Sequence, residues 1–157
     1  MAQEERTCYY EDYEIGQEWE STGRTITETD NMSWVYLTGE WHPLHVDEVY
    51  ARAHTPFRTR MPPGMMVAAI AIGIAGPLKI TGGRGAVAFV EQTARYKQPV
   101  RIGDTIHVKI RLAEKKPTSN PKRGLIRFNA LVLNQDGVVC QDNDWVFLVA
   151  RHRAEEG

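Results

Sequence analysis

Residues 61–78 read MPPGMMVAAIAIGIAGPL and contain no charged side chain. A membrane span needs about 20 predominantly apolar residues, so this run, which is bounded by prolines, falls short of one. A helix that is apolar on all sides is otherwise a buried helix. We therefore predict a central core helix that begins near Pro63–Gly64 and ends near Gly76. Its small residues would let a sheet approach closely: Ala68, Ala69, Ala71, Gly73 and Ala75.

The second half of the chain alternates apolar and polar residues, which is the period of a half-buried strand. Ile106 to Leu112 and Ile126 to Val132 follow this pattern. Residues 85–98 indicate a further strand, and the pair Asp136-Gly137 favours a hairpin into a last strand over 138–149. A buried helix followed by consecutive long strands predicts an α+β domain whose antiparallel sheet wraps around the helix.

Shorter elements are expected before the core helix. Residues 18–27 indicate a first strand. Thr27 and Asp30 have the spacing of a helix N-cap signal, which predicts a helix from Glu28 to about Leu37. Gly39 ends this helix, because glycine readily takes the left-handed conformation found at many helix ends.

Size and composition indicate a soluble protein with one domain. We expect the domain to span residues 1–157, with a core over about 9–151 and a polar tail after it that frays. The net charge of −1 gives no reason to expect nucleic acid or membrane as a partner. Basic residues gather over 95–128, either as solvated strand faces or as an electropositive rim for an anionic ligand. Cys8 and Cys140 lie far apart and the N-terminus lacks an apolar run, so a cytoplasmic location is expected.

The stretch over 36–51, YLTGEWHPLHVDEVYA, carries the most chemistry. We expect a turn over 40–45 and then a short helix over 47–53. Glu40 and His45 are a carboxylate and an imidazole five residues apart across that turn, and such a pair can hold one water. Paired proton transfer from the two groups adds water to a double bond or removes it.

His42, His45 and Asp47 also permit a metal interpretation, since two imidazoles and a carboxylate suit zinc or iron. Pro43 lies between the histidines, however, and the pair lacks the i, i+4 spacing on a helix that is typical of zinc motifs. We therefore expect no metal site here. Asp47 is better explained as a helix cap.

Three motifs occur in the order that is typical of a known family. They are Tyr36 with Thr38-Gly39-Glu40 and Pro43-Leu44-His45, then Pro62-Pro63-Gly64-Met65, and finally Pro99-Val100 with Gly103-Asp104-Thr105. In these motifs the chain, from about Tyr9 to Arg151, resembles the MaoC-like dehydratases, a hot-dog-fold family that includes the (R)-specific enoyl-CoA hydratases.

The resemblance implies a hot-dog fold, in which an antiparallel sheet wraps around one long central helix. It implies a lyase that reversibly hydrates a 2-enoyl-CoA to a 3-hydroxyacyl thioester, with Glu40 and His45 as the catalytic pair and His42 in support. Gly64 and Met65 would bind the thioester oxygen or the substrate, because N–H groups at a helix start lack intrahelical partners. Coenzyme A would be the substrate's carrier, with no metal or redox cofactor, and the assembly would be a homodimer or a dimer-based oligomer.

The chain departs from the family motifs at three positions. Glu40 stands for the family's aspartate, His42 for its asparagine and Pro63 for a histidine. Glutamate adds one methylene, which moves the carboxylate by roughly 1.5 Å. Two other functions therefore stay open: a hot-dog thioesterase, which the lack of a carboxylate over 65–76 disfavours, and a non-catalytic acyl-thioester binding protein.

Two further groups of residues are weaker candidates. Arg58 and Arg60 precede the core helix, where they either bind a substrate carboxylate or are ordinary exposed loop residues. Tyr96, Lys97 and Arg101 either meet the carrier's phosphates or form a solvated edge.

Overall fold

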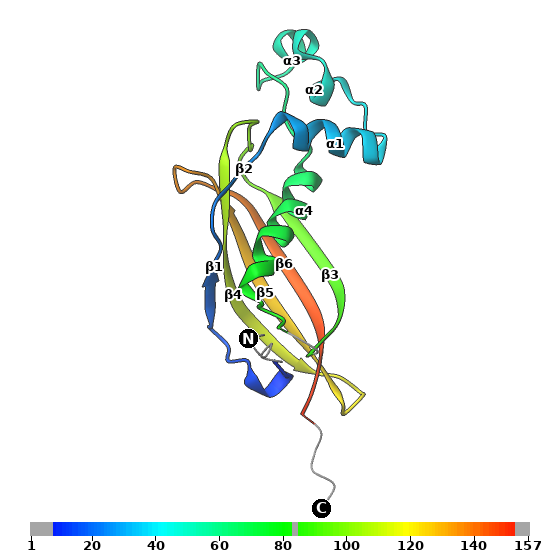
Figure 1. Ribbon diagram of the computed structural model, residues 1–157, viewed down its shortest axis with the longest axis vertical. Coiled ribbons are helices and arrows are strands. Elements are labelled where there is room, and N and C mark those ends of the chain that lie inside the picture. The colour runs from blue at the N-terminus through cyan, green and yellow to red at the C-terminus, as the bar shows by residue number, and fades with distance from the viewer. Residues whose placement is uncertain (1–7, 83–84, 153–157) are drawn as a thin grey trace, which may run out of the picture.

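The structure is a computed structural model that describes residues 8–82 and 85–152, so the end of the predicted polar tail lies outside the described residues. Within these residues a sheet of six strands curves around helix α4 (Gly64–Ala75) (Figure 1). The main path of the sheet runs in the order β1 (Glu18–Glu20), β4 (Thr105–Pro117), β5 (Arg123–Leu133), β6 (Val139–Ala150) and β3 (Ala86–Tyr96). Strand β2 (Arg24–Thr25) also pairs with β4, and all of these pairings are antiparallel. The predicted α+β class and the hot-dog arrangement are confirmed.

The predicted bounds of the core helix are confirmed, but its burial on all sides is not. One face packs into the core through Met66, Val67, Ala71 and Ala75. The opposite face is open in the single chain: Met65 is 61% exposed, and Ala69 and Gly73 are exposed as well. The sheet covers only one side of the helix, and the sequence of a helix that is apolar all round does not show which side that is. No helix in the described part of the chain is long and apolar enough to cross a membrane.

The alternating strands are confirmed, and their apolar residues form most of the core. Strand β4 buries Ile106, Val108, Ile110 and Leu112, and β5 buries Ile126, Phe128, Ala130 and Val132. The predicted hairpin turn is present, with Gly137 at φ +73°. Strand β3 pairs with β6, the last strand, and not with β4, which follows it in the chain.

The single strand predicted over 18–27 was wrong, because β1 and β2 are separate. Ser21, which lies between them, accepts a hydrogen bond from Val108 N–H through its hydroxyl at 2.9 Å. Its own N–H donates to the Val108 carbonyl at 3.0 Å. The side chain thus takes a donor that a strand backbone would otherwise use, and this interrupts the pairing.

Residues 28–54 form a helical head beyond one end of the sheet, made of α1 (Glu28–Thr38), α2 (Pro43–Val46) and α3 (Glu48–His54) (Figure 1). Helix α1 has the predicted start and end, with a capping box at its N-terminus and a left-handed glycine after its last residue. Helix α3 is also as predicted, because the Asp47 carboxylate accepts from Tyr50 N–H.

The predicted turn over 40–45 is only partly correct, because α2 begins inside it at Pro43. Proline suits the first position of a helix, since its φ is already helical and its missing N–H would have no partner there. Pro43, which suggested a turn in the sequence, is thus the first residue of the helix that carries His45.

Candidate active site

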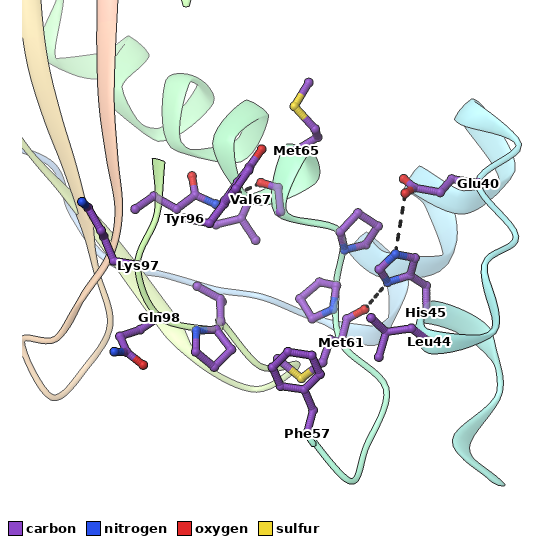
Figure 2. A pocket seen from close by; sticks show the side chains of 16 residues that line it. Glu40, Leu44, His45, Phe57, Met61, Met65, Val67, Tyr96, Lys97 and Gln98 are labelled. Carbon is purple, nitrogen blue, oxygen red and sulfur yellow. Dashed lines mark hydrogen bonds and ion pairs between the residues drawn. The ribbon is translucent and has the colours of Figure 1, made fainter. Parts of the chain in front are cut away.

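A cavity of about 560 Å³ lies between the helical head and the N-terminal end of α4 (Figure 2). Four of the predicted site residues line it: Glu40, His45, Gly64 and Met65. The head supplies the first two, and the start of α4 supplies the others. Apolar side chains from Leu44, Phe57, Met61, Val67 and Val100 line much of the remainder.

The His45 ring is buried and oriented by a backbone carbonyl. Its Nδ1 lies 2.6 Å from the Met61 oxygen. A carbonyl oxygen can only accept, so Nδ1 carries the proton and donates it. The other nitrogen, Nε2, faces the Glu40 carboxylate, with 3.6 Å between Nε2 and Oε1 (Figure 2). In the neutral imidazole this nitrogen therefore has a free lone pair that points to Glu40.

The backbone of His45 is held by Asn31, a residue that the sequence did not single out. Asn31 is fully buried in α1, and its amide nitrogen donates to the His45 carbonyl at 2.9 Å. One buried asparagine on a helix looks like any other polar residue in sequence. Its role appears only when α1 and α2 are seen together.

The Glu40 side chain is 46% exposed and lies at the cavity wall. The Trp34 indole N–H donates to Oε2 at 3.3 Å, which leaves Oε1 toward His45. At 3.6 Å, Oε1 and Nε2 are too far apart for a direct hydrogen bond. A water about 2.8 Å from each atom would contact both. The pair can therefore hold one water and move a proton to or from it.

Gly64 and Met65, the first residues of α4, line the same cavity. The first N–H groups of a helix have no intrahelical acceptor, and the helix dipole adds positive potential there. Gln141, on β6, fixes this end of the helix, because its side-chain amide donates to the Gly64 carbonyl at 2.9 Å. Glycine at position 64 leaves room for the Tyr96 ring, because a Cβ there would lie 2.6 Å from Tyr96 Cε1 unless the ring moved. Sequence reasoning found Gly64 but missed Gln141.

His42 does not line the cavity. Its Nδ1 accepts from Leu44 N–H at 3.2 Å, so the ring caps α2. The centres of the His42 and His45 rings are 6.0 Å apart. Over residues 8–82 and 85–152, no cluster of three or more metal-ligating side chains gathers at this or any other place.

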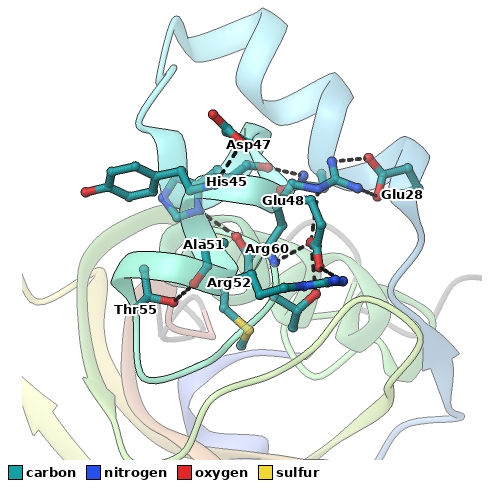
Figure 3. A network of polar contacts seen from close by, with 12 residues as sticks. Glu28, His45, Asp47, Glu48, Ala51, Arg52, Thr55 and Arg60 are labelled. Atoms are coloured by element: carbon teal, nitrogen blue, oxygen red, sulfur yellow. Dashed lines mark hydrogen bonds and ion pairs between the residues drawn. The ribbon is translucent and has the colours of Figure 1, made fainter.

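The two arginines before α4 do not face the cavity. The Arg60 guanidinium pairs with Glu28 at 2.7 Å and 3.0 Å (Figure 3). Glu48 accepts from the Arg60 backbone N–H at 3.0 Å, and this bond is the largest cause that lowers the pKa of Glu48. The Arg58 guanidinium donates to the Arg52 carbonyl. Arg60 thus ties the loop before α4 to the helical head, next to the Met61 carbonyl that orients His45.

Tyr96 and Lys97, from the end of β3, do line the cavity, whereas Arg101 is not among its lining residues. Lys97 is therefore the one cation among these lining residues apart from any charge on His45.

Comparison with known proteins gives consistent matches. A family model described as MaoC like domain matches residues 12–132. The chain is 37% identical over 117 residues to a 3-hydroxybutyryl-CoA dehydratase of Methylorubrum extorquens, covering 74% of this chain and 71% of that protein. It is 39% identical over 98 residues to an (R)-specific enoyl-CoA hydratase of Rhodospirillum rubrum, covering 62% and 65%. A solved structure from Archaeoglobus, titled a monoamine oxidase regulatory protein, superposes with a TM-score of 0.88 at 31% identity, over 92% of this chain and 95% of that one.

Proposed function

This chain belongs to the MaoC-like dehydratase family, and from that premise we propose that it is a lyase that reversibly adds water to a 2-enoyl-CoA, giving a 3-hydroxyacyl-CoA. The relatives named 3-hydroxybutyryl-CoA dehydratase and (R)-specific enoyl-CoA hydratase support this reaction class. The observation that carries the proposal is the pair Glu40 Oε1 and His45 Nε2, 3.6 Å apart in a cavity that also contains the start of α4.

In the proposed reaction, Glu40 and His45 hold one water above the double bond. The water oxygen bonds to the β-carbon as one of the two groups takes a proton from it. The other group, which carries a proton at the start of the step, gives that proton to the α-carbon. The product gains one hydroxyl and one hydrogen, and one proton has in effect passed from this group to the other. Glu40 takes the role of the family's aspartate, and Trp34 holds its longer side chain in place.

The thioester oxygen binds the backbone N–H groups at Gly64 and Met65. Negative charge builds on this oxygen as the water attacks, and preorganised N–H donors stabilise it most at that point. His42 supports the site by capping α2, the helix that carries His45. We propose no redox cofactor, because the hydration of a conjugated thioester moves protons and transfers no electrons. We propose no metal either, because in this proposal the backbone N–H groups at Gly64 and Met65 stabilise the thioester oxygen.

We propose a homodimer, because the single chain leaves apolar residues exposed on two elements, α4 and β3. One is the exposed face of α4, with Met65, Ala69 and Gly73. The other is β3, which ends the sheet and exposes Phe89 by 42% and Val90 by 50%. Long apolar edge strands favour pairing with another chain. Met65 also lines the cavity, so the partner would approach the site.

We also propose a cytoplasmic location and a single functional domain. Cys8 and Cys140 are both free cysteines, which suits a reducing compartment. The family match covers residues 12–132, which is most of the described chain.

A panel of 2-enoyl-CoAs of increasing chain length tests the function. We expect loss of the enoyl absorbance without release of free thiol, for at least one substrate. Thiol release without hydration would identify a thioesterase. Thermal stabilisation by acyl-CoA with neither hydration nor thiol release would identify a binding protein. A thioesterase result or a binding-protein result would contradict the proposal.

A further inference from the structure

Glu40 is held by a tryptophan that takes no part in proton transfer. Trp34 Nε1 lies 3.3 Å from Glu40 Oε2, and the Trp34 ring packs against the hydrophobic core. Indole N–H is a donor only, so the bond occupies Oε2. The other oxygen, Oε1, stays directed to His45.

The backbone of Glu40 is fixed by the same turn of α1. The Thr38 hydroxyl donates to the Trp34 carbonyl at 2.7 Å, and Thr38 Oγ1 accepts from Glu40 N–H at 3.3 Å. Between them, Gly39 takes a left-handed conformation at φ +73° and turns the chain back. Glu40 is thus held at its backbone by Thr38 and at its carboxylate by Trp34.

The length of the glutamate side chain allows the contact with Trp34 and also gives it a purpose. Glutamate has one more rotatable bond than aspartate, and ordering a long side chain at a half-exposed position costs conformational entropy. An aspartate carboxylate would be displaced by roughly 1.5 Å, which is enough to break a contact that is already 3.3 Å long.

We propose that Trp34 is a positioning residue that fixes the Glu40 carboxylate toward His45, so that tryptophan at 34 and glutamate at 40 work as a matched pair. This inference rests on the proposed hydratase function. It explains how the chain keeps a working geometry with glutamate in place of the family's aspartate.

A double-mutant cycle tests the pair. Trp34→Phe keeps an aromatic ring in the core but removes the N–H, and we expect kcat for enoyl-CoA hydration to fall about tenfold with KM within about twofold. We expect a smaller loss than the roughly hundredfold cost of a 1 Å misplacement, because the Glu40 backbone stays fixed by Thr38. In the Glu40→Asp background, where the contact cannot form, Trp34→Phe should change kcat by less than about twofold.

Trp41→Phe is the matched control, because Trp41 is 52% exposed, does not line the cavity and contacts the Tyr36 ring instead. It should leave kcat near the wild-type value. An equal tenfold loss from Trp34→Phe in both the wild-type and Glu40→Asp backgrounds would overturn the proposal, because Trp34 would then act through something other than Glu40. If Trp34→Phe fails to fold, benzothienylalanine at position 34 replaces only the N–H with sulfur and serves the same cycle.

A measurement without substrate separates this inference from the proposed function. The chain has four tryptophans, so four indole N–H signals can be assigned by NMR with single Trp→Phe variants. We expect Glu40→Asp to shift the Trp34 signal and to speed its exchange with solvent. If no enoyl-CoA is hydrated but this signal responds, the function fails and the contact stands. If hydration occurs and the signal does not respond, the contact is wrong.

Discussion

Replacing Gly64 with alanine is a quantitative test of the proposed oxyanion donors. The new Cβ would lie 2.6 Å from Tyr96 Cε1, whereas ordinary contacts begin at 3.4 Å. The start of α4 and the Tyr96 ring must therefore separate by the 0.8 Å between these values. Tyr96 is 54% exposed, so its ring can take up part of the strain. We expect the free energy of unfolding to fall by about 1 kcal/mol, the low end for overpacking.

The effect on catalysis should be larger than the effect on stability. A shift of about 1 Å can cost a hundredfold in rate, and loss of one oxyanion donor costs about 10²–10³ in kcat. Because the ring absorbs some of the movement, we expect kcat to fall roughly thirtyfold to a hundredfold with little change in KM. Initial rates of enoyl-CoA hydration and a denaturation curve measure the two effects.

The clash itself can be removed in a second variant. In the Gly64→Ala background, Tyr96→Leu should restore kcat to near that of Tyr96→Leu alone, because the ring that meets the new methyl group is gone. A Gly64→Ala enzyme with wild-type kcat would refute the reasoning. So would a loss that Tyr96→Leu fails to relieve.

Three further predictions concern stability and assembly. Asn31→Leu removes the donor to the His45 carbonyl, so the free energy of unfolding should fall by about 1–3 kcal/mol; an unchanged denaturation midpoint would contradict this. For Asp30, burial raises the pKa, but hydrogen bonds from Thr27 and the Arg24 guanidinium outweigh it and lower the pKa below 3.8. Asp30 therefore stabilises the fold at neutral pH, and this stability is lost as the pH falls from about 4 through the folded-state pKa. Asp30→Asn should lower the melting temperature at pH 7 and make it depend less on pH below about 4. Curves of melting temperature against pH that run parallel for the wild type and the variant would count against this prediction. Val90→Lys puts a charge on the open strand β3 and should convert the proposed dimer to a monomer in sedimentation. A dimer that persists in this variant would exclude this edge as the interface.

The elements whose cause is local were predictable from sequence. Helix α4 begins and ends at the prolines and glycines around it, and β4 shows its buried face directly in its alternation. The two ends of helix α1 are marked in the sequence by its caps, Thr27 and Gly39. In each case the deciding residues lie within a few positions of the element, so the pattern is complete in one stretch of chain.

The supports of the site were not predictable because their partners are distant in sequence. Gln141 reaches Gly64 across 77 residues, and His45 is oriented by a carbonyl 16 residues away. A backbone acceptor leaves no mark in the sequence. The open face of α4 was missed for a related reason, since the residues of an apolar helix do not show which of its faces the sheet covers.

The central claim is that Glu40 and His45 act as one unit on a single water. Hydration rates of the wild type, Glu40→Gln, His45→Gln and the double variant test it most directly. Each single change should lower kcat by at least about a hundredfold, and the double variant should be little slower than the worse single variant, because residues that act together are not additive. Wild-type turnover in either single variant, or losses that multiply in the double variant, would contradict the account.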